Sequence, residues 1–332
     1  MLEKTIKQVL DKKIEDWIKS IWSTSLQQIV RDNLIVTGGC FTSMIQNEVP
    51  KDFDCYFLTK EATVAVAEYY VQVWNEAHKD QTNALGKQTK VFVLDGERPD
   101  PELLSYYNIT SLNYSQSRMI ANTPPDRIKI IFPSDGIVGD PNAVRSEEEL
   151  GSAETVAEEI DEVKAEEAIS SEERKYFPVF LSTNAITLSN GIQIVVRFYG
   201  YPDQIHSTYD FVHTKAYWVC RDGEVVIPKE VYEATINKTL FYTGSKYPVC
   251  SVFRTRKFIS RGWKINAGQL LKMCIQISQL DLMNIDVLED QLVGVDSIYF
   301  MNLIHQFAKQ QAKGDFELTT GYVMSVIDKI FG

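Results

Sequence analysis

The fold of this chain is decided by residues 33–57, which read NLIVTGGCFTSMIQNEVPKDFDCYF. A short apolar run is followed by a glycine pair, a helix-compatible stretch, a turn and a second apolar run. This order predicts a strand or helix end, a tight loop, a short helix and a strand. The loop and the start of the second strand carry the residues with the most specific chemistry.

The glycine pair predicts a phosphate-binding backbone. Gly38 and Gly39 can adopt positive φ and approach a bulky anion, and free N–H groups at the start of the next helix would point at that anion. Ser43 follows four residues after Gly39 and can add a hydroxyl to the same site. We expect these three residues to contact phosphate groups.

A carboxylate pair follows on the second strand. Because side chains alternate along a strand, Asp52 and Asp54 should project from one face while Phe53 points to the other. Two carboxylates so close repel each other unless a cation lies between them. Mg²⁺ and similar hard cations prefer such oxygen ligands together with substrate phosphates.

A plainer interpretation is a Gly-Gly turn followed by an Asp-rich loop, and most isolated D-x-D pairs bind no metal. The glycine pair, Ser43 and their spacing to Asp52 and Asp54 favour the metal interpretation in this chain.

A glycine pair, a serine four residues later and a D-x-D on the next strand resemble the nucleotidyltransferase superfamily, which includes DNA polymerase β, poly(A) polymerases and CCA-adding enzymes. The resemblance implies that Gly38, Gly39 and Ser43 hold the triphosphate of an incoming nucleotide. It also implies that Asp52 and Asp54 share Mg²⁺ or Mn²⁺ with a third carboxylate on a later strand. The overall pattern is similar to proteins of bacteriophages.

Asp210 is our candidate for that third metal ligand. Asn190-Gly191 between two β-rich runs predicts a hairpin, and a third strand is expected to begin near Tyr209. An adjacent strand could bring Asp210 beside the carboxylate pair, although a turn or helix-cap aspartate is the alternative. His206 is a weaker candidate ligand, and a strand would place His213 on the opposite face, as a structural histidine.

A basic helix is predicted within residues 247–264. Arg254, Lys257 and Arg261 fall at helical spacing and so share one face, and Gly262 is a plausible helix stop. The pattern is similar to an R-x-x-K-[FY]-x-x-R-G helix of poly(A) polymerase relatives, which implies a phosphate-neutralising role. A merely solvated basic face is the alternative.

Charge and composition are compatible with a nucleotide-binding enzyme. The net charge is −11, but residues 147–173 hold twelve acidic side chains and one lysine, so the remainder of the chain sums to zero. No apolar run approaches the roughly 20 residues that a membrane helix needs. Five scattered cysteines without a C-x-x-C pair indicate a reducing, cytoplasmic compartment and argue against structural zinc.

We therefore expect an α/β (α+β) fold with a mixed sheet, flanking helices and a helical C-terminal domain. The core is expected at residues 1–140 and 176–222, an acidic insertion at 141–175, and the helical domain at 223–332. The elements outside the motifs are expected as helices at 1–31, 60–78, 270–282, 295–307 and 320–331, and as strands at 90–94 and 128–132.

The predicted function is metal-dependent transfer of a nucleoside monophosphate from an NTP, such as ATP, to a hydroxyl acceptor, with RNA as the expected acceptor and no membrane partner. The absence of a G-x-x-x-x-G-K-[ST] motif weakens a kinase or ATPase alternative. Two alternatives stay open: a binding or assembly module that does not turn over nucleotide, and an enzyme that adenylylates a protein.

Overall fold

The computed structural model describes residues 3–79, 88–94, 127–131, 175–182 and 184–284, together with residues 287, 288, 291, 321, 324 and 325. The chain divides into two compact units, which are described separately. The first comprises Met1–Asp140, Glu167–Ser207 and Ala216–Ile227, and the remaining residues form the second. The predicted acidic insertion, residues 141–175, lies outside the described residues except for Lys175, so the predicted domain limits stay predictions.

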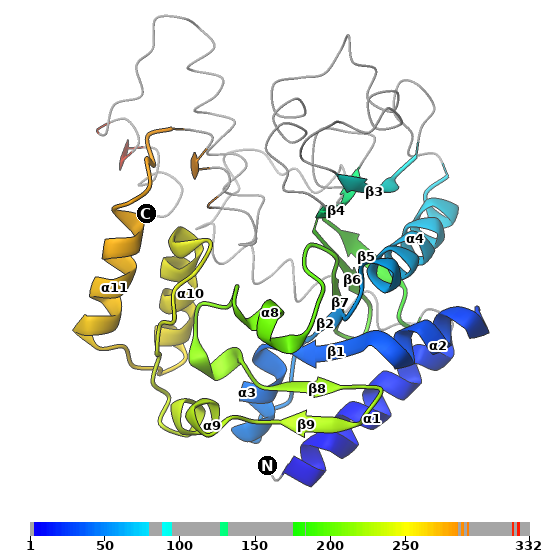
Figure 1. The fold of residues 1–332 in the computed structure, drawn as a ribbon, viewed down its shortest axis with the longest axis horizontal. Helices are drawn as coiled ribbons and strands as arrows, with labels where there is room; N and C mark the ends of the chain where they lie inside the picture. The colour runs from blue at the N-terminus through cyan, green and yellow to red at the C-terminus, as the bar shows by residue number, and fades with distance from the viewer. Residues whose placement is uncertain are drawn as a thin grey trace, which may run out of the picture. The chain divides into compact units, whose positions relative to one another are not determined.

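The first unit is built on a seven-stranded mixed sheet with the order β5-β6-β7-β2-β1-β8-β9 (Figure 1). Its strands are β1 (Leu34–Thr37), β2 (Phe53–Phe57), β5 (Pro178–Leu181), β6 (Ala185–Leu188), β7 (Ile192–Val195), β8 (Tyr217–Val219) and β9 (Glu224–Val226). Only β2 and β7 pair in parallel, and the other pairs in this sheet are antiparallel. The expectation of an α/β fold with a mixed sheet, flanking helices and C-terminal helices is confirmed.

The predicted hairpin at Asn190-Gly191 joins β6 to β7. Both residues have positive φ, 63° at Asn190 and 69° at Gly191. A two-residue turn with this backbone matches the twist of the strands that it connects, and asparagine followed by glycine adopts it most readily. The sequence signal was therefore sufficient to predict the turn.

The two faces of the sheet differ in chemistry. On β6 and β7 the alternate residues Ile186, Leu188, Ile192 and Ile194 are buried, and the residues between them are half-buried. The apolar face packs against α1 (Glu3–Ser20), as the Lys13 ammonium lies 5.6 Å from the ring centre of Phe53 on β2. The opposite face is more polar and carries Asp54.

The N-terminal region forms two helices, so the expectation of one helix over residues 1–31 is wrong. The first is α1, and the second is α2 (Thr24–Asn33). The break falls at Ser23, whose hydroxyl accepts a hydrogen bond from the backbone N–H of Leu26 and caps α2. Serine competes for backbone donors in this way, which favours a new helix start over a continuous helix.

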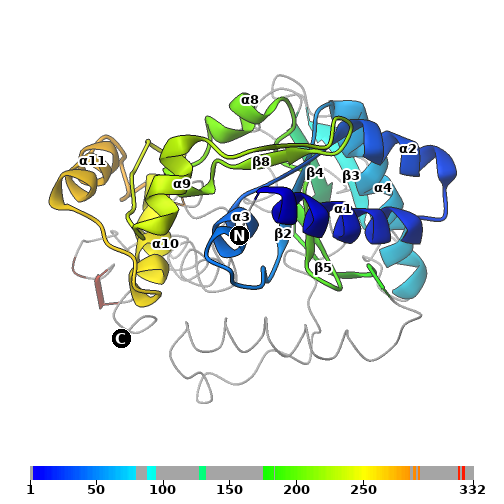
Figure 2. The ribbon, with the colours of Figure 1, turned by 90° about the horizontal axis from the view of Figure 1, so that it is seen from below.

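The remaining elements of the first unit are α3 (Gly39–Ile45), α4 (Lys60–Ala77), the β3–β4 hairpin (Lys90–Leu94 and Arg127–Ile131) and α8 (Pro202–His206). The indole N–H of Trp17 on α1 donates to the Tyr70 hydroxyl on α4 at 2.7 Å, so both helices lie on the same face. In Figure 2, α8 and α1 lie on opposite sides of β8. The sequence predicted α4, β3 and β4, and it missed α8.

The second unit contains the short 3-10 helix η4 (Val212–Thr214) and the helices α9 (Lys229–Ile236), α10 (Pro248–Ser260) and α11 (Ala267–Ile277). Its core is formed by Phe211, Leu240, Tyr242, Trp263 and Met273. A strand starting near Tyr209 was expected, and this is wrong: the backbone there forms an isolated bridge and η4, and β8 begins at Tyr217. The predicted helices at 295–307 and 320–331 lie outside the described residues, apart from Gly321, Met324 and Ser325.

None of the helices in the described ranges is long and apolar enough to cross a membrane.

Candidate functional site

The loop between β1 and α3 has a backbone that glycine alone adopts readily. Gly38 has φ 91° and ψ −152°, which is a region closed to residues with a Cβ atom. A Cβ built on Gly38 would lie 2.4 Å from Oδ2 of Asp54, whereas a Cβ on Gly39 would meet nothing within 4 Å. Gly38 is thus required by its conformation and by Asp54, and Gly39 borders open space.

The antiparallel pairing of β1 and β2 brings the loop and the carboxylates to the same edge of the sheet. β1 ends at Thr37, which is in register with Asp54. Asp52 is exposed and Asp54 is half-buried. Burial raises the pKa of the Cys40 thiol, and the nearby charges of Asp54 and Asp52 raise it further. This thiol in α3 therefore stays protonated at neutral pH, and the charges of both carboxylates reach it.

The donor set fits a hard divalent cation such as Mg²⁺. Asp52 and Asp54 offer carboxylate oxygens, and Asp52 makes no hydrogen bond to any of the described residues. The hydrogen of Gly38 leaves room for the Asp54 carboxylate where any side chain would displace it. These two aspartates are the residues that would hold a metal ion together with substrate phosphates.

The third predicted phosphate contact, Ser43, is half-buried in α3. Its backbone carbonyl accepts from the N–H of Glu48 at 2.8 Å, and its hydroxyl makes no hydrogen bond within the described ranges. Because α3 spans only seven residues, the case for phosphate binding depends on the glycine backbone and not on this helix.

The β6–β7 turn contacts the backbone on both sides of Asp52. The N–H of Phe53 donates to the carbonyl of Gly191 at 2.8 Å, and a Cβ on Gly191 would lie 2.4 Å from the carbonyl oxygen of Lys51. The Lys13 ammonium donates to the carbonyl of Asn190. The turn therefore fixes the backbone that enters β2 at Asp52.

His206 contacts Thr37, the β1 residue in register with Asp54. The Thr37 hydroxyl donates to the carbonyl of Ala216 at 2.7 Å, and it lies 2.8 Å from Nε2 of His206. A hydroxyl has one proton, so Nε2 of His206 must donate to Thr37. His206, considered from the sequence as a possible metal ligand, thus directs Nε2 at a threonine beside Asp54.

The strand that neighbours β2 on its other side supplies no carboxylate. Gln193 on β7 is in register with Asp54, and Val195 follows on the same face. Among the described residues, no three or more His, Cys, Asp or Glu side chains gather where they could share a metal ion. Within the first unit, the candidate site therefore consists of Asp52 and Asp54 beside the amide of Gln193.

Asp210, the predicted third ligand, is a buried residue of the second unit. Its carboxylate accepts from Nη1 of Arg254 at 2.7 Å. The structure thus brings together two predicted site residues as an ion pair, which gives Asp210 a structural role. A metal-binding role for Asp210 stays a prediction.

The predicted basic helix is present as α10. It ends at Ser260, and Gly262 follows with φ 80°, as expected for a glycine helix stop. Arg254 is half-buried against Asp210, whereas Lys257 and Arg261 are exposed. Contact of these cations with phosphate stays a prediction.

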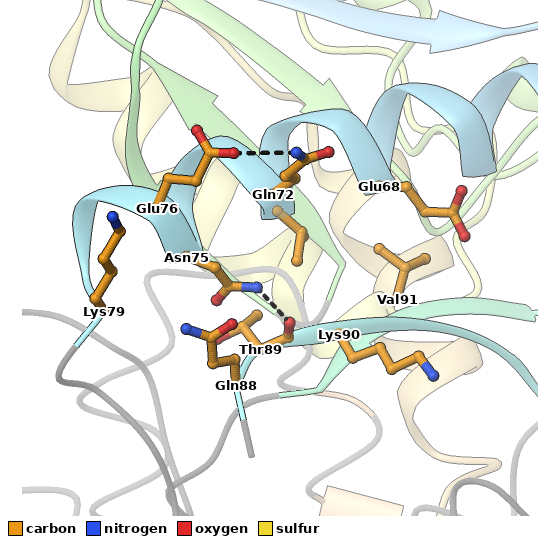
Figure 3. A pocket seen from close by; sticks show the side chains of 10 residues that line it. Glu68, Gln72, Asn75, Glu76, Lys79, Gln88, Thr89, Lys90 and Val91 are labelled. Atoms are coloured by element: carbon orange, nitrogen blue, oxygen red, sulfur yellow. Dashed lines mark hydrogen bonds between the residues drawn. The ribbon is translucent and has the colours of Figure 1, made fainter. Parts of the chain in front are cut away.

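A hollow of about 550 Å³ lies between α4 and β3, and none of the predicted site residues lines it (Figure 3). Two hydrogen bonds join residues of its lining: Asn75 donates to the carbonyl of Thr89 at 2.8 Å, and Gln72 donates to Glu76 at 3.0 Å. The chemistry of the hollow gives no reason to prefer it over the carboxylate site.

Sequence reasoning missed three residues that lie beside the aspartates or beside the backbone that leads to them. Thr37, Gln193 and Gly191 are placed beside the carboxylates by strand register and by the hairpin. The hairpin signal at Asn190-Gly191 was visible, but nothing in the sequence indicated that β7 would pair with β2.

Comparison with protein families corrects the resemblance drawn from the motifs. The matching family model is the Gabija anti-defense 2 family, over residues 8–238, and the assignment to the nucleotidyltransferase superfamily is therefore wrong. A glycine turn beside paired aspartates is a short motif that can occur in unrelated proteins. The motif therefore did not identify the family. No curated protein matches the sequence. Because the match covers more than half of the chain, this protein belongs to the Gabija anti-defense 2 (Gad2) family.

Proposed function

We propose that the chain transfers a nucleoside monophosphate from an NTP to a hydroxyl acceptor at the site formed by Gly38, Gly39, Asp52 and Asp54. The observation that carries the proposal is the close contact of Asp54 with Gly38 at the edge where β1 ends and β2 begins. It places a backbone suited to phosphates directly beside carboxylates suited to a divalent cation.

Each group has a defined task in this proposal. Asp52 and Asp54 hold Mg²⁺ or Mn²⁺, which when bound neutralises charge on the phosphates and on the attacking and leaving oxygens. The glycine backbone positions the phosphates. The acceptor oxygen forms a bond to the α-phosphorus while the bond from that phosphorus to the pyrophosphate breaks, and the acceptor proton passes to solvent.

The family name refers to counteracting a defence system called Gabija and names no chemistry. We infer that the chain acts in the cytoplasm of a phage-infected host, where modification of an RNA or protein acceptor would serve anti-defence. No membrane partner is part of this proposal.

A second candidate is nucleotide capture without turnover. The position on β7 that faces Asp54 is held by Gln193. A neutral amide adds no charge to the site, which favours binding of one cation over the two that phosphoryl-transfer enzymes often use. This candidate predicts nucleotide binding without labelled product.

The test is incubation of the protein with each α-labelled NTP, Mg²⁺ or Mn²⁺, and either pooled RNA or total host protein. We expect label on one acceptor pool from the wild type and none from Asp52→Asn with Asp54→Asn. The matched control is Asp222→Asn, which alters an exposed aspartate in the β8–β9 turn that pairs with the adjacent Arg221.

The outcomes separate the candidates. Label on RNA or on a protein band identifies the acceptor class. Metal-dependent binding of NTP without label supports capture. Equal labelling by the wild type and the double variant contradicts the proposed site.

A further inference from the structure

One row of side chains crosses the whole seven-stranded sheet on the face that carries Asp54. Strand register aligns one residue from each strand, in the order Phe180, Thr187, Gln193, Asp54, Thr37, Tyr217 and Val226. Laterally paired residues share a face, so these side chains lie side by side, perpendicular to the strands.

The two neighbours of Asp54 in this row differ in burial. On the β1 side, Thr37 is fully buried, and its hydroxyl contacts the carbonyl of Ala216 and His206 of α8. On the β7 side, Gln193 is half-buried, as are Thr187 and Phe180 beyond it and Tyr217 and Val226 at the other end of the row. Because Thr37 blocks the β1 side directly beside Asp54, the half of the row over β7, β6 and β5 is the one open to a ligand that extends from the carboxylates.

The open half offers polar groups that the fold itself does not use. The Gln193 amide and the Thr187 hydroxyl make no hydrogen bond to other residues in the described part of the chain. An amide can donate and accept at once, and so can a hydroxyl. Phe180 adds an aromatic ring at the outer end, next to an irregularity in the β5–β6 register.

We propose that this open half, formed by Gln193, Thr187 and Phe180, binds the nucleoside end of the nucleotide whose phosphates lie at Gly38 and the carboxylate pair. The inference rests on the proposed function and adds to it the residues that recognise the sugar and base. Adjacent strands lie about 4.8 Å apart, so Phe180 is about 14 Å from Asp54 along the row. A nucleoside attached to phosphates at Asp54 extends over this distance.

Each residue has a distinct role in this subsite. Gln193, next to Asp54, faces the sugar hydroxyls, and Thr187 faces the sugar or the base edge. Phe180 stacks on the base, an interaction that tolerates any base because every base has a π face.

The test compares two ligands that share phosphates and differ in the nucleoside. The affinities of the full-length chain for ATP, GTP, CTP and UTP, and for inorganic tripolyphosphate, are measured by titration calorimetry with Mg²⁺. We expect the wild type to bind at least one NTP more tightly than tripolyphosphate. Gln193→Leu, Thr187→Val and Phe180→Leu should each lower the affinity for that NTP by about tenfold, and Thr187→Val and Phe180→Leu should leave tripolyphosphate binding unchanged.

Gln8→Leu serves as the matched control, since Gln8 is an exposed residue of α1. It should bind both ligands as the wild type does. Unchanged tripolyphosphate affinity also shows that a variant has kept its fold.

The inference is overturned if all three variants bind the NTP as the wild type does, or if the wild type binds tripolyphosphate and NTP equally. In either case the proposed phosphate and metal site stands. If the wild type binds neither ligand, or if Asp52→Asn with Asp54→Asn binds both as before, the proposed function fails and this subsite fails with it.

Discussion

Gly38 is the residue on which the geometry of the site depends most. Its backbone conformation is one that a residue with a side chain adopts only at a cost of about 1–3 kcal/mol. Its missing Cβ also leaves the space that the Asp54 carboxylate occupies. The neighbouring Gly39 has neither constraint, so the two glycines should respond differently to the same replacement.

Gly38→Ala is expected to lower the free energy of unfolding by about 1–3 kcal/mol, because alanine at this φ and ψ is strained. Urea denaturation of the wild type and the variant measures the difference. Gly39→Ala is the matched control and should stay within about 0.5 kcal/mol of the wild type. Equal stability of all three proteins would show that the Gly38 conformation is not required.

Gly39→Ala is expected to weaken Mg²⁺-dependent NTP binding even though it leaves the fold intact. The new methyl group would project into open space where a phosphate approaches the backbone. Titration calorimetry with the NTP measures the change, and Gly321→Ala, another glycine with open space around it, provides a control. Wild-type affinity in Gly39→Ala would mean that no ligand approaches this part of the loop.

At the scale of the element, the packing of η4 against α10 makes the second unit sensitive to acid. His213 of η4 is fully buried, with its ring 4.5 Å from that of Phe258 and 4.3 Å from that of Trp263. Burial lowers the pKa of His213 to about 4, and the charge of Asp210 opposes this shift only in part. The unfolded chain therefore binds a proton at this histidine more readily than the folded chain does.

This pKa difference predicts a stability that is complete above pH 6.5 and is lost as the pH falls from 6.5 towards 4. The loss is on the order of 3 kcal/mol. Urea denaturation followed by tryptophan fluorescence, to which Trp263 contributes, measures it across this pH range. His213→Leu should remove most of the acid dependence, and His78→Gln, at the end of α4, should keep it. Identical pH profiles for the wild type and His213→Leu would contradict this account.

The Asp210–Arg254 ion pair connects the segment before η4 to α10. Arg254→Met is expected to lower the free energy of unfolding by about 1–3 kcal/mol, because it leaves a buried carboxylate without its partner. Adding Asp210→Asn should restore part of the loss, and a double-mutant cycle measures this coupling. Additive effects of the two replacements would show that the pair contributes nothing.

The same variants bear on the predicted metal role of Asp210. If the aspartate is only the partner of Arg254, Asp210→Asn retains Mg²⁺-dependent NTP binding. Loss of that binding, with the fold retained, would instead support the prediction that Asp210 is a metal ligand.

For the whole molecule, local patterns in the sequence predicted the elements well and predicted their long-range pairing poorly. The strand, loop, helix and strand of residues 33–57 were found because glycine, apolar runs and alternation act over short distances. The hairpin at Asn190-Gly191 was found for the same reason. The parallel pairing of β2 with β7 joins segments that are far apart in the chain, and no local signal specifies it.

This difference explains why the strand expected to carry the third carboxylate, Asp210, was predicted wrongly. From the sequence, a strand near Tyr209 was expected beside β2, whereas the neighbouring strand is β7 and carries Gln193 in register. The family, too, was not predicted, because the motif residues describe a kind of site and are only a small part of residues 8–238, over which the Gad2 family matches. The chemistry assigned to the site from its residues therefore stays a proposal, whereas the family came from the match over most of the chain.

Asp52 and Asp54, beside Gly38, are proposed to form a nucleotide site that depends on a divalent cation. The most direct measurement is titration calorimetry of the wild type and Asp54→Asn with NTP, in the presence of Mg²⁺ and of EDTA. The account predicts binding by the wild type with Mg²⁺, with a loss of affinity of tenfold or more in EDTA and in Asp54→Asn. Binding that is equally strong in EDTA, or equally strong in Asp54→Asn, would contradict it.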